Sequence, residues 1–297
     1  MKLNGVFIPA ITPFEDDELL SVCKLEYNIE KWNRTQVGGY MCLGSNGEFR
    51  MLDDEESLEV IRAFIRCKGE DKMLIAGAGR ESLYHTLKFI DRIQKEPKGP
   101  DIISVLTPHY FRNAMTDKAL VEYYTKIADF SIYPVMMYCA PGFANGVCIS
   151  CEVLKELADH PNICGIKDTS SDMMLSYMEA VGDRKDFQVM AGSVNTLYLC
   201  LQSGGEAAVL SAANYYPQEC AELITIWNKE GEGSFLTAYE NLKEKIRKTG
   251  GIGGVAGVKC CMNQLGYQAG IPRNPLMPLP EEKVFMIRQA LKCEKEM

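Results

Sequence analysis

The chain has 297 residues, of which 46% are hydrophobic and 24% are charged, and its net charge is −8 at pH 7. This composition is typical of a globular protein with a substantial core, and the length suits one large domain or two ordinary ones. The acidic balance argues against nucleic acid or an anionic membrane as the main partner. The first residues resemble neither a secretory signal nor a transit peptide, and no apolar run is long enough to span a bilayer, so we expect a cytoplasmic protein without membrane contact.

Short apolar stretches recur along the chain, with helix-like stretches between them. They are continuously apolar rather than alternating, which is typical of parallel strands covered on both faces. The predicted strands are residues 5–12, 38–45, 73–79, 101–108, 133–141, 163–170, 187–193 and 207–213.

The stretches between these strands are amphipathic, and several begin with a good N-cap residue. Asp53, Thr116 and Ser150 each stand directly before such a stretch. The predicted helices are residues 54–67, 82–94, 117–128, 150–159 and 171–181. Repeated strand–helix alternation places the chain in the α/β class and predicts a (β/α)8 TIM barrel, with a doubly wound open sheet as the alternative on pattern alone.

The pattern changes after residue 216, where strand-like runs end. Helices are predicted at residues 218–227, 234–248, 255–264 and 281–292. Because no Ser/Gly-rich linker separates the two parts, we predict a barrel catalytic domain over 1–216 and a C-terminal helical extension over 217–297 that packs on the barrel.

The cysteines and glycines offer no convincing cofactor site. Twelve cysteines are present, several inside apolar runs, and Cys148 with Cys151 forms a single C-x-x-C. A structural zinc site needs a second pair of ligands, and the three histidines are scattered, so reduced thiols without metal are expected. The stretch 250–257 is close to a dinucleotide fingerprint but follows a helix rather than a strand, so no nucleotide cofactor is expected.

Polar residues gather near the carboxyl ends of the predicted strands, where barrel enzymes place their chemistry. GSNGE (44–48) follows the second strand and TPHY (107–110) the fourth. The fifth strand contains Tyr138, the sixth contains Lys167, and the seventh ends in AGS (191–193).

Lys167 stands in an apolar strand, an unusual place for an ammonium group. One interpretation is a structural lysine paired with Asp168 or with a carboxylate of the barrel floor. The other is an amine kept out of water, which attacks ketones to form a Schiff base. Tyr138 is then a proton carrier beside the amine rather than a core aromatic. The amides of Ser45 and Asn46 suit a carboxylate, although any Gly-rich turn has this composition.

Together these residues resemble the dihydrodipicolinate synthase / N-acetylneuraminate lyase superfamily of class I aldolases. The resemblance covers nearly the whole chain and is carried by GSNGE (44–48), TPHYF (107–111), Y-x-x-P (138–141) and GIKD (165–168), in this order and spacing. GSNGEF, HPNICGIKD, DFQVMAGS and GIPRNPL are also similar to segments of 4-hydroxy-2-oxoglutarate aldolases.

The resemblance implies a role for each matching residue. Lys167 forms the imine with the keto carbon of pyruvate, and Tyr138 is the general acid/base. Ser45 relays protons to Tyr138, and Asn46 helps to hold the carboxylate. Tyr110 is lent across a subunit interface, which implies a homotetramer built as a dimer of dimers. No metal or organic cofactor is implied. The remaining implied substrate-binding residues are Thr169, Gly192, Ser193 and Val209.

Three positions depart from the family's other patterns. Phe143 stands where dihydrodipicolinate synthases carry an arginine, and Cys139 where they usually carry asparagine. Ser193 follows Gly192, where neuraminate lyases have acidic residues nearby. We therefore expect a lyase that cleaves or condenses a 4-hydroxy-2-oxo acid such as 4-hydroxy-2-oxoglutarate, yielding pyruvate and an aldehyde. Dihydrodipicolinate synthase, a sugar-acid aldolase or dehydratase, and a non-catalytic 2-oxo acid sensor remain the alternatives.

Overall fold

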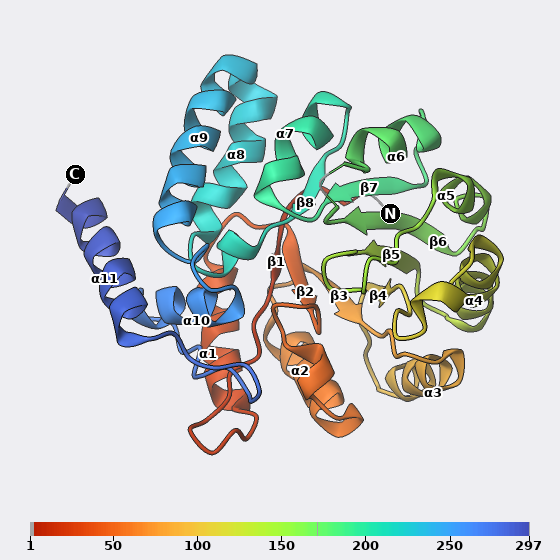
Figure 1. Ribbon diagram of the computed structural model, residues 1–297, viewed down its shortest axis with the longest axis horizontal. Coiled ribbons are helices and arrows are strands. Elements are labelled where there is room, and N and C mark those ends of the chain that lie inside the picture. The colour runs from red at the N-terminus through yellow and green to blue at the C-terminus, as the bar shows by residue number, and fades with distance from the viewer. Residues whose placement is uncertain (1–2, 171, 297) are drawn as a thin grey trace. The chain divides into compact units, whose positions relative to one another are not determined.

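The computed structural model describes residues 3–170 and 172–296 and contains eight parallel strands in the order of a closed barrel (Figure 1). The strands are β1 (Gly5–Pro9), β2 (Gly39–Cys42), β3 (Met73–Gly77), β4 (Ile102–Leu106), β5 (Val135–Cys139), β6 (Ile163–Asp168), β7 (Gln188–Ala191) and β8 (Ala207–Val209). The helices are α1 (Val22–Asn33), α2 (Asp54–Cys67), α3 (Leu83–Gln94), α4 (Asp117–Phe130), α5 (Cys151–Leu157), α6 (Met174–Val181), α7 (Val194–Gln202), α8 (Pro217–Glu230), α9 (Glu232–Lys248), α10 (Val255–Gln264) and α11 (Glu281–Glu296). The predicted TIM barrel with C-terminal helices is confirmed, and the open sheet is excluded.

The predicted strands are all present but shorter than their apolar runs, because those runs continue into the loops. The last run, for example, gives β8 and then a 3-10 helix, Ser211–Asn214. Two helices, α1 and α7, lie where the sequence analysis named none. Helix α7, VNTLYLCLQ, is short and rich in apolar residues, and it buries Thr196, Leu197, Cys200 and Leu201.

The N-caps predicted from sequence are confirmed. The Asp53 carboxylate accepts a hydrogen bond from the Glu56 amide at 2.8 Å, and the Glu56 side chain accepts one from the Asp53 amide, which completes a capping box on α2. At the start of α4 the Thr116 hydroxyl accepts a hydrogen bond from the Ala119 amide, and at the start of α5 the Ser150 hydroxyl accepts one from the Val153 amide. These caps satisfy helix amides that have no partner within the helix.

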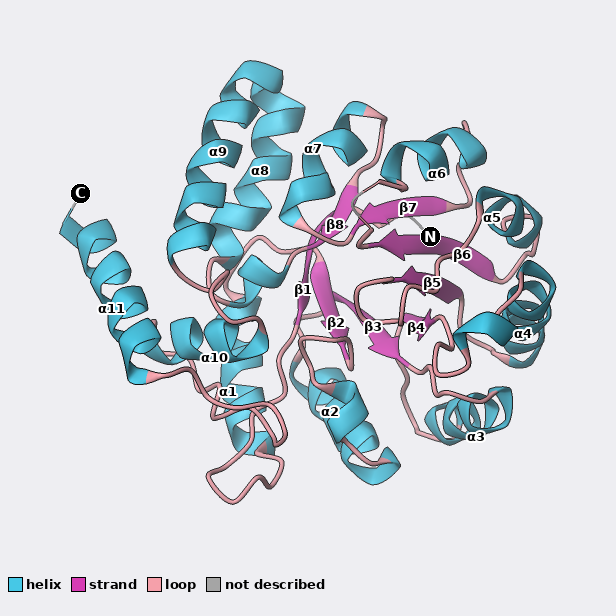
Figure 2. Cartoon of the chain, in the orientation of Figure 1, coloured by secondary structure: helices cyan, strands magenta, loops and turns pink. Residues whose placement is uncertain are grey.

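Contacts group the chain into two compact units, each made of stretches far apart in sequence. The first unit is Met1–Asn4 with Met73–Val209, and the second is Gly5–Lys72 with Leu210–Met297. In the first unit β3 to β8 pair in parallel, and helices α3 to α7 lie outside them (Figure 2). In the second unit β1 pairs with β2. The domain boundary expected between residues 216 and 217 stays a prediction.

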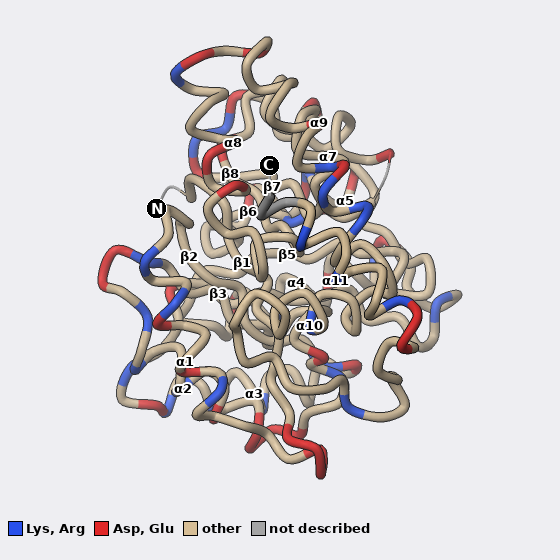
Figure 3. The backbone as a smooth tube through the Cα atoms, turned by 90° about the vertical axis from the view of Figure 1, so that its left-hand side faces the viewer, with Lys and Arg blue, Asp and Glu red and all other residues tan. Residues whose placement is uncertain are grey.

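Charged residues lie mostly on helices and loops (Figure 3), while the strands are almost wholly apolar. Among the strands described within residues 3–170 and 172–296, only β6 carries charged residues, namely Lys167 and Asp168. The same part of the chain contains no helix both long and apolar enough to cross a membrane. Burying charge is costly, so the two charged residues of β6 call for an explanation.

Candidate active site

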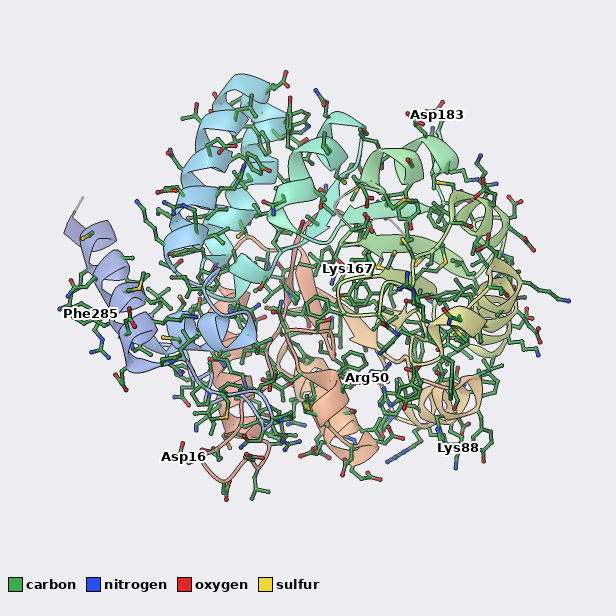
Figure 4. The ribbon with its side chains drawn as sticks, in the orientation of Figure 1. Asp16, Arg50, Lys88, Lys167, Asp183 and Phe285 are labelled. Atoms are coloured by element: carbon green, nitrogen blue, oxygen red, sulfur yellow. The ribbon has the colours of Figure 1, made fainter. Side chains whose placement is uncertain are left out.

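Lys167 and Tyr138 lie side by side on neighbouring strands of the first unit. They are register partners in the β5–β6 pairing, and both are buried, each with 4% of its surface exposed. The Lys167 Nζ atom is 4.0 Å from the centroid of the Tyr138 ring, among the strands of this unit (Figure 4). Paired residues of adjacent strands project to the same face of a sheet, so the pairing itself brings amine and phenol together.

Asp168 is not the partner of Lys167. Successive residues of a strand point to opposite faces, and the Asp168 carboxylate is fully buried on the face away from Lys167. It accepts hydrogen bonds from the Ser170 amide at 3.0 Å and the Ser170 hydroxyl at 2.7 Å. Burial raises the pKa of Asp168, and these two bonds counteract part of that rise. Within residues 3–170 and 172–296 Lys167 has no ion pair, so the interpretation as a salt-bridged structural lysine is wrong.

The ends of β6, β7 and β8 bring four further candidates into the same unit. The Gly192 amide donates to the Asp168 carbonyl at 2.6 Å, and a Cβ atom on Gly192 would lie 2.4 Å from that oxygen. Only glycine fits this close approach. Thr169 is half-buried and its hydroxyl donates to the Cys139 carbonyl at 3.2 Å. Ser193 precedes α7 and bonds Thr196 at 3.1 Å, and Val209 is buried at the end of β8.

Tyr110 lies on an exposed loop after β4. Its side chain is 75% exposed and packs edge-on against Phe111, with ring centroids 5.0 Å apart. The backbone is nevertheless fixed, because the amides of His109 and Tyr110 both donate to the Glu81 carboxylate, at 2.7 and 2.5 Å. An exposed aromatic pair on an ordered loop suits contact with another subunit, which stays a prediction.

Ser45 and Asn46 belong to the second unit, in the loop after β2. The Ser211 hydroxyl lies 3.2 Å from the Asn46 Oδ1 atom, and the Thr12 hydroxyl donates to the Gly47 carbonyl at 2.7 Å. These bonds hold the loop in one conformation. The approach of Ser45 and Asn46 to Lys167 stays a prediction.

Glu48 completes that loop and is a residue that sequence reasoning missed. Its carboxylate is fully buried and forms an ion pair with Lys259 of α10, Nζ to Oε1 2.6 Å, while the Arg273 amide donates to its other oxygen at 2.9 Å. The Lys259 ammonium also donates to the Ile271 carbonyl at 2.7 Å. Desolvation lowers the pKa of Lys259 to about 8. No local pattern connects residues so far apart in sequence.

A second missed feature is the pairing of cysteines. Cys148 shares the C-x-x-C motif with Cys151, but its sulfur lies 3.3 Å from that of Cys139, a contact that the motif does not indicate. In the part of the chain that the structure describes, no group of three or more His, Cys, Asp or Glu residues is arranged to hold a metal.

Comparison with known proteins gives a consistent result. The dihydrodipicolinate synthetase family matches residues 2–294. A 4-hydroxy-tetrahydrodipicolinate synthase of Methanospirillum hungatei is 31% identical over 97% of this chain and 98% of its own length. A probable mitochondrial 4-hydroxy-2-oxoglutarate aldolase of Emericella nidulans is 25% identical over 96% of this chain and 93% of its own. The crystal structure of a dihydrodipicolinate synthase from Bacillus anthracis shares the fold, with a TM-score of 0.91, 21% identity, and 98% of both chains covered.

Proposed function

The chain belongs to the dihydrodipicolinate synthetase family of class I carbon–carbon lyases, and from this premise we propose that Lys167 forms a Schiff base with the keto carbon of pyruvate or another 2-oxo acid. The observation that carries the proposal is a buried amine with no ion pair among the described residues, 4.0 Å from the ring of Tyr138. A lysine amine in this position can add to the carbonyl of a 2-oxo acid and form an imine.

The proposed mechanism follows from that pair. The Lys167 amine adds to C2 of the substrate, and Tyr138 supplies and removes the protons that allow water to leave. The resulting protonated imine accepts the electron pair when the C3–C4 bond breaks. The aldehyde departs, and protonation of the enamine followed by hydrolysis releases pyruvate and restores the lysine. The reaction needs no metal or organic cofactor, because the imine itself is the electron sink.

The other site residues are proposed in the roles that the family implies. Ser45 relays protons to Tyr138, and Asn46 binds the carboxylate of the 2-oxo acid. Tyr110 completes the relay from a neighbouring subunit of a homotetramer, a role suited to its exposed position. Thr169 and Ser193 lie on the loops that follow β6 and β7, where barrel enzymes hold the distal part of a substrate.

We propose that the substrate is a 4-hydroxy-2-oxo acid such as 4-hydroxy-2-oxoglutarate, cleaved to pyruvate and an aldehyde. Phe143 supports this choice, since it stands where synthases of the family carry the arginine for aspartate semialdehyde, and the Emericella nidulans relative bears the aldolase name. A second candidate is condensation of pyruvate with aspartate semialdehyde. It is favoured by the name of the more similar Methanospirillum hungatei relative.

Borohydride reduction in the presence of 2-oxo acids tests the imine. We expect the intact mass to rise by one reduced pyruvyl group, and peptide mapping to locate it on Lys167. The K167A variant should stay unmodified, whereas K126A, which removes an exposed lysine of the same unit, should react like wild type. A modified peptide elsewhere, or no adduct with any 2-oxo acid, would refute the proposal. Rates with hydroxy-oxoglutarate and with aspartate semialdehyde then distinguish the two substrates.

A further inference from the structure

Two thiols face each other one residue away from Tyr138. Cys139 is the last residue of β5, and Cys148 lies in the segment between β5 and α5. Their sulfur atoms are 3.3 Å apart. The hydroxyl of Tyr177, from α6, lies 3.4 Å from each sulfur and donates to the Ile149 carbonyl at 2.5 Å. Strand alternation explains the placement, because Cys139 points to the helix side when Tyr138 points inward.

The two thiols differ in exposure and in acidity. Cys139 is fully buried, while Cys148 is partly exposed. The hydrogen bond between them lowers the pKa of Cys148 and raises that of Cys139. Burial and the nearby charge of Asp168 oppose the first effect, and the Tyr177 hydroxyl assists it. Thiolate character together with exposure is what makes a cysteine react with oxidants, so Cys148 is the more reactive of the pair.

Other interpretations of the pair fit less well. A zinc site needs further ligands, and the described residues contain no cluster of three or more His, Cys, Asp or Glu able to hold a metal. Cys151, the other member of the C-x-x-C motif, begins α5, and burial and nearby acidic groups raise its pKa. The sulfur in contact with that of Cys148 is the Cys139 sulfur at 3.3 Å, which suits an attacking thiol and a resolving thiol.

We propose that Cys139 and Cys148 are a modification site that hydroperoxides oxidise to a disulfide. The Cys148 thiolate attacks one peroxide oxygen and breaks the O–O bond, which gives a sulfenic acid and releases an alcohol, or water when the oxidant is hydrogen peroxide. The Cys139 thiol then attacks the sulfenic sulfur and expels water. In total two thiols and one hydroperoxide yield one disulfide, one alcohol and one water, and the peroxide is the species reduced.

This site goes beyond the proposed lyase activity and does not depend on it. The sulfur atoms need to approach from 3.3 Å to a bond length of about 2.05 Å. That movement of the two sulfur atoms is small. The cross-link would tie the end of β5, next to Tyr138, to the segment that follows it.

The test exposes the reduced full-length protein to hydrogen peroxide, alkylates the remaining thiols, and maps disulfides by peptide mass spectrometry. We expect an intact mass lower by two hydrogen atoms and a cross-linked peptide pair joining Cys139 to Cys148. During peroxide treatment the Cys148 thiol should be lost to alkylation at least about tenfold faster than the thiol of Cys200. The Cys200 thiol is buried and has its pKa raised to about 11. Dithiothreitol should restore both thiols.

Three variants separate the roles. C151S should form the cross-link like wild type. C148S should form none, and C139S should stop at a sulfenic acid on Cys148 that dimedone captures. Two results with the wild-type protein would overturn the inference: a cross-link between Cys148 and Cys151, or alkylation of both Cys139 and Cys148 after peroxide. Neither result depends on whether the variants fold. Borohydride trapping of the same samples before oxidation reports on the imine separately, so the two proposals fail independently.

Discussion

Removing the Glu48 charge should destabilise the protein strongly. Glu48 and Lys259 form a buried ion pair, with side-chain exposures of 0% and 1% and a separation of 2.6 Å. The variant E48Q keeps the size of the side chain and leaves the Lys259 ammonium buried without an opposite charge. The Ile271 carbonyl then remains as an uncharged acceptor for it.

The magnitude follows from the separation. Two unit charges at 2.6 Å attract by about 6 kcal/mol at an effective dielectric constant of ~20. In the wild type this attraction offsets the cost of taking both charges out of water. Once the carboxylate is gone the desolvation cost of the ammonium remains, and breaking one side of such a pair typically costs about 3–5 kcal/mol. We expect E48Q to lose that much unfolding free energy.

Denaturant unfolding at pH 7 of wild type, E48Q and the double variant E48Q/K259M measures this loss. The double variant removes the unpaired ammonium as well and should recover a large part of the stability lost in E48Q. The matched control is E240Q, which breaks an exposed pair with Lys243 and should unfold like wild type. If E48Q unfolds within about 1 kcal/mol of wild type, the reasoning that burial makes this pair costly to break is refuted.

Three further outcomes are expected. Tyr138→Phe removes the proposed proton carrier, so kcat for cleavage should fall by about 10²–10⁴-fold and borohydride trapping should become slower; an unchanged kcat would remove Tyr138 from the mechanism. Gly192→Ala places a methyl group 2.4 Å from the Asp168 carbonyl oxygen and should cost about 1–3 kcal/mol in denaturant unfolding, whereas a neutral result would mean that the loop shifts freely. Asp53→Ala removes the carboxylate that accepts from the Glu56 amide and should lower the unfolding free energy by about 1 kcal/mol. The control is Met173→Ala at the N-cap of α6, whose side chain makes no capping bond, and an equal loss there would contradict capping as the cause.

Much of the fold follows from local sequence. Continuous apolar runs identified all eight strands, because a parallel strand covered on both faces has no polar side. The caps at Asp53, Thr116 and Ser150 were also predictable, since a capping oxygen serves amides only two or three residues away. Helices α1 and α7 were not predicted from the sequence.

The candidate site was predictable in part. Lys167 was conspicuous because a charged residue inside an apolar strand is unusual. Tyr138 was a candidate because a phenol on the preceding strand suits a proton carrier beside an amine. Their separation could not come from spacing in the sequence. It depends on the register in which β5 and β6 pair, and a shift of one residue would turn either side chain to the opposite face.

The sequence by itself determined which segments become strands and helices, and it singled out an amine in an apolar strand. Only the tertiary structure decided which side chains meet. It assigned Ser170 rather than Lys167 to Asp168, and it brought Cys139 to Cys148. The physical reason is that strand and helix signals arise from neighbours in the chain, whereas ion pairs and thiol pairs arise from packing between segments that the sequence keeps apart.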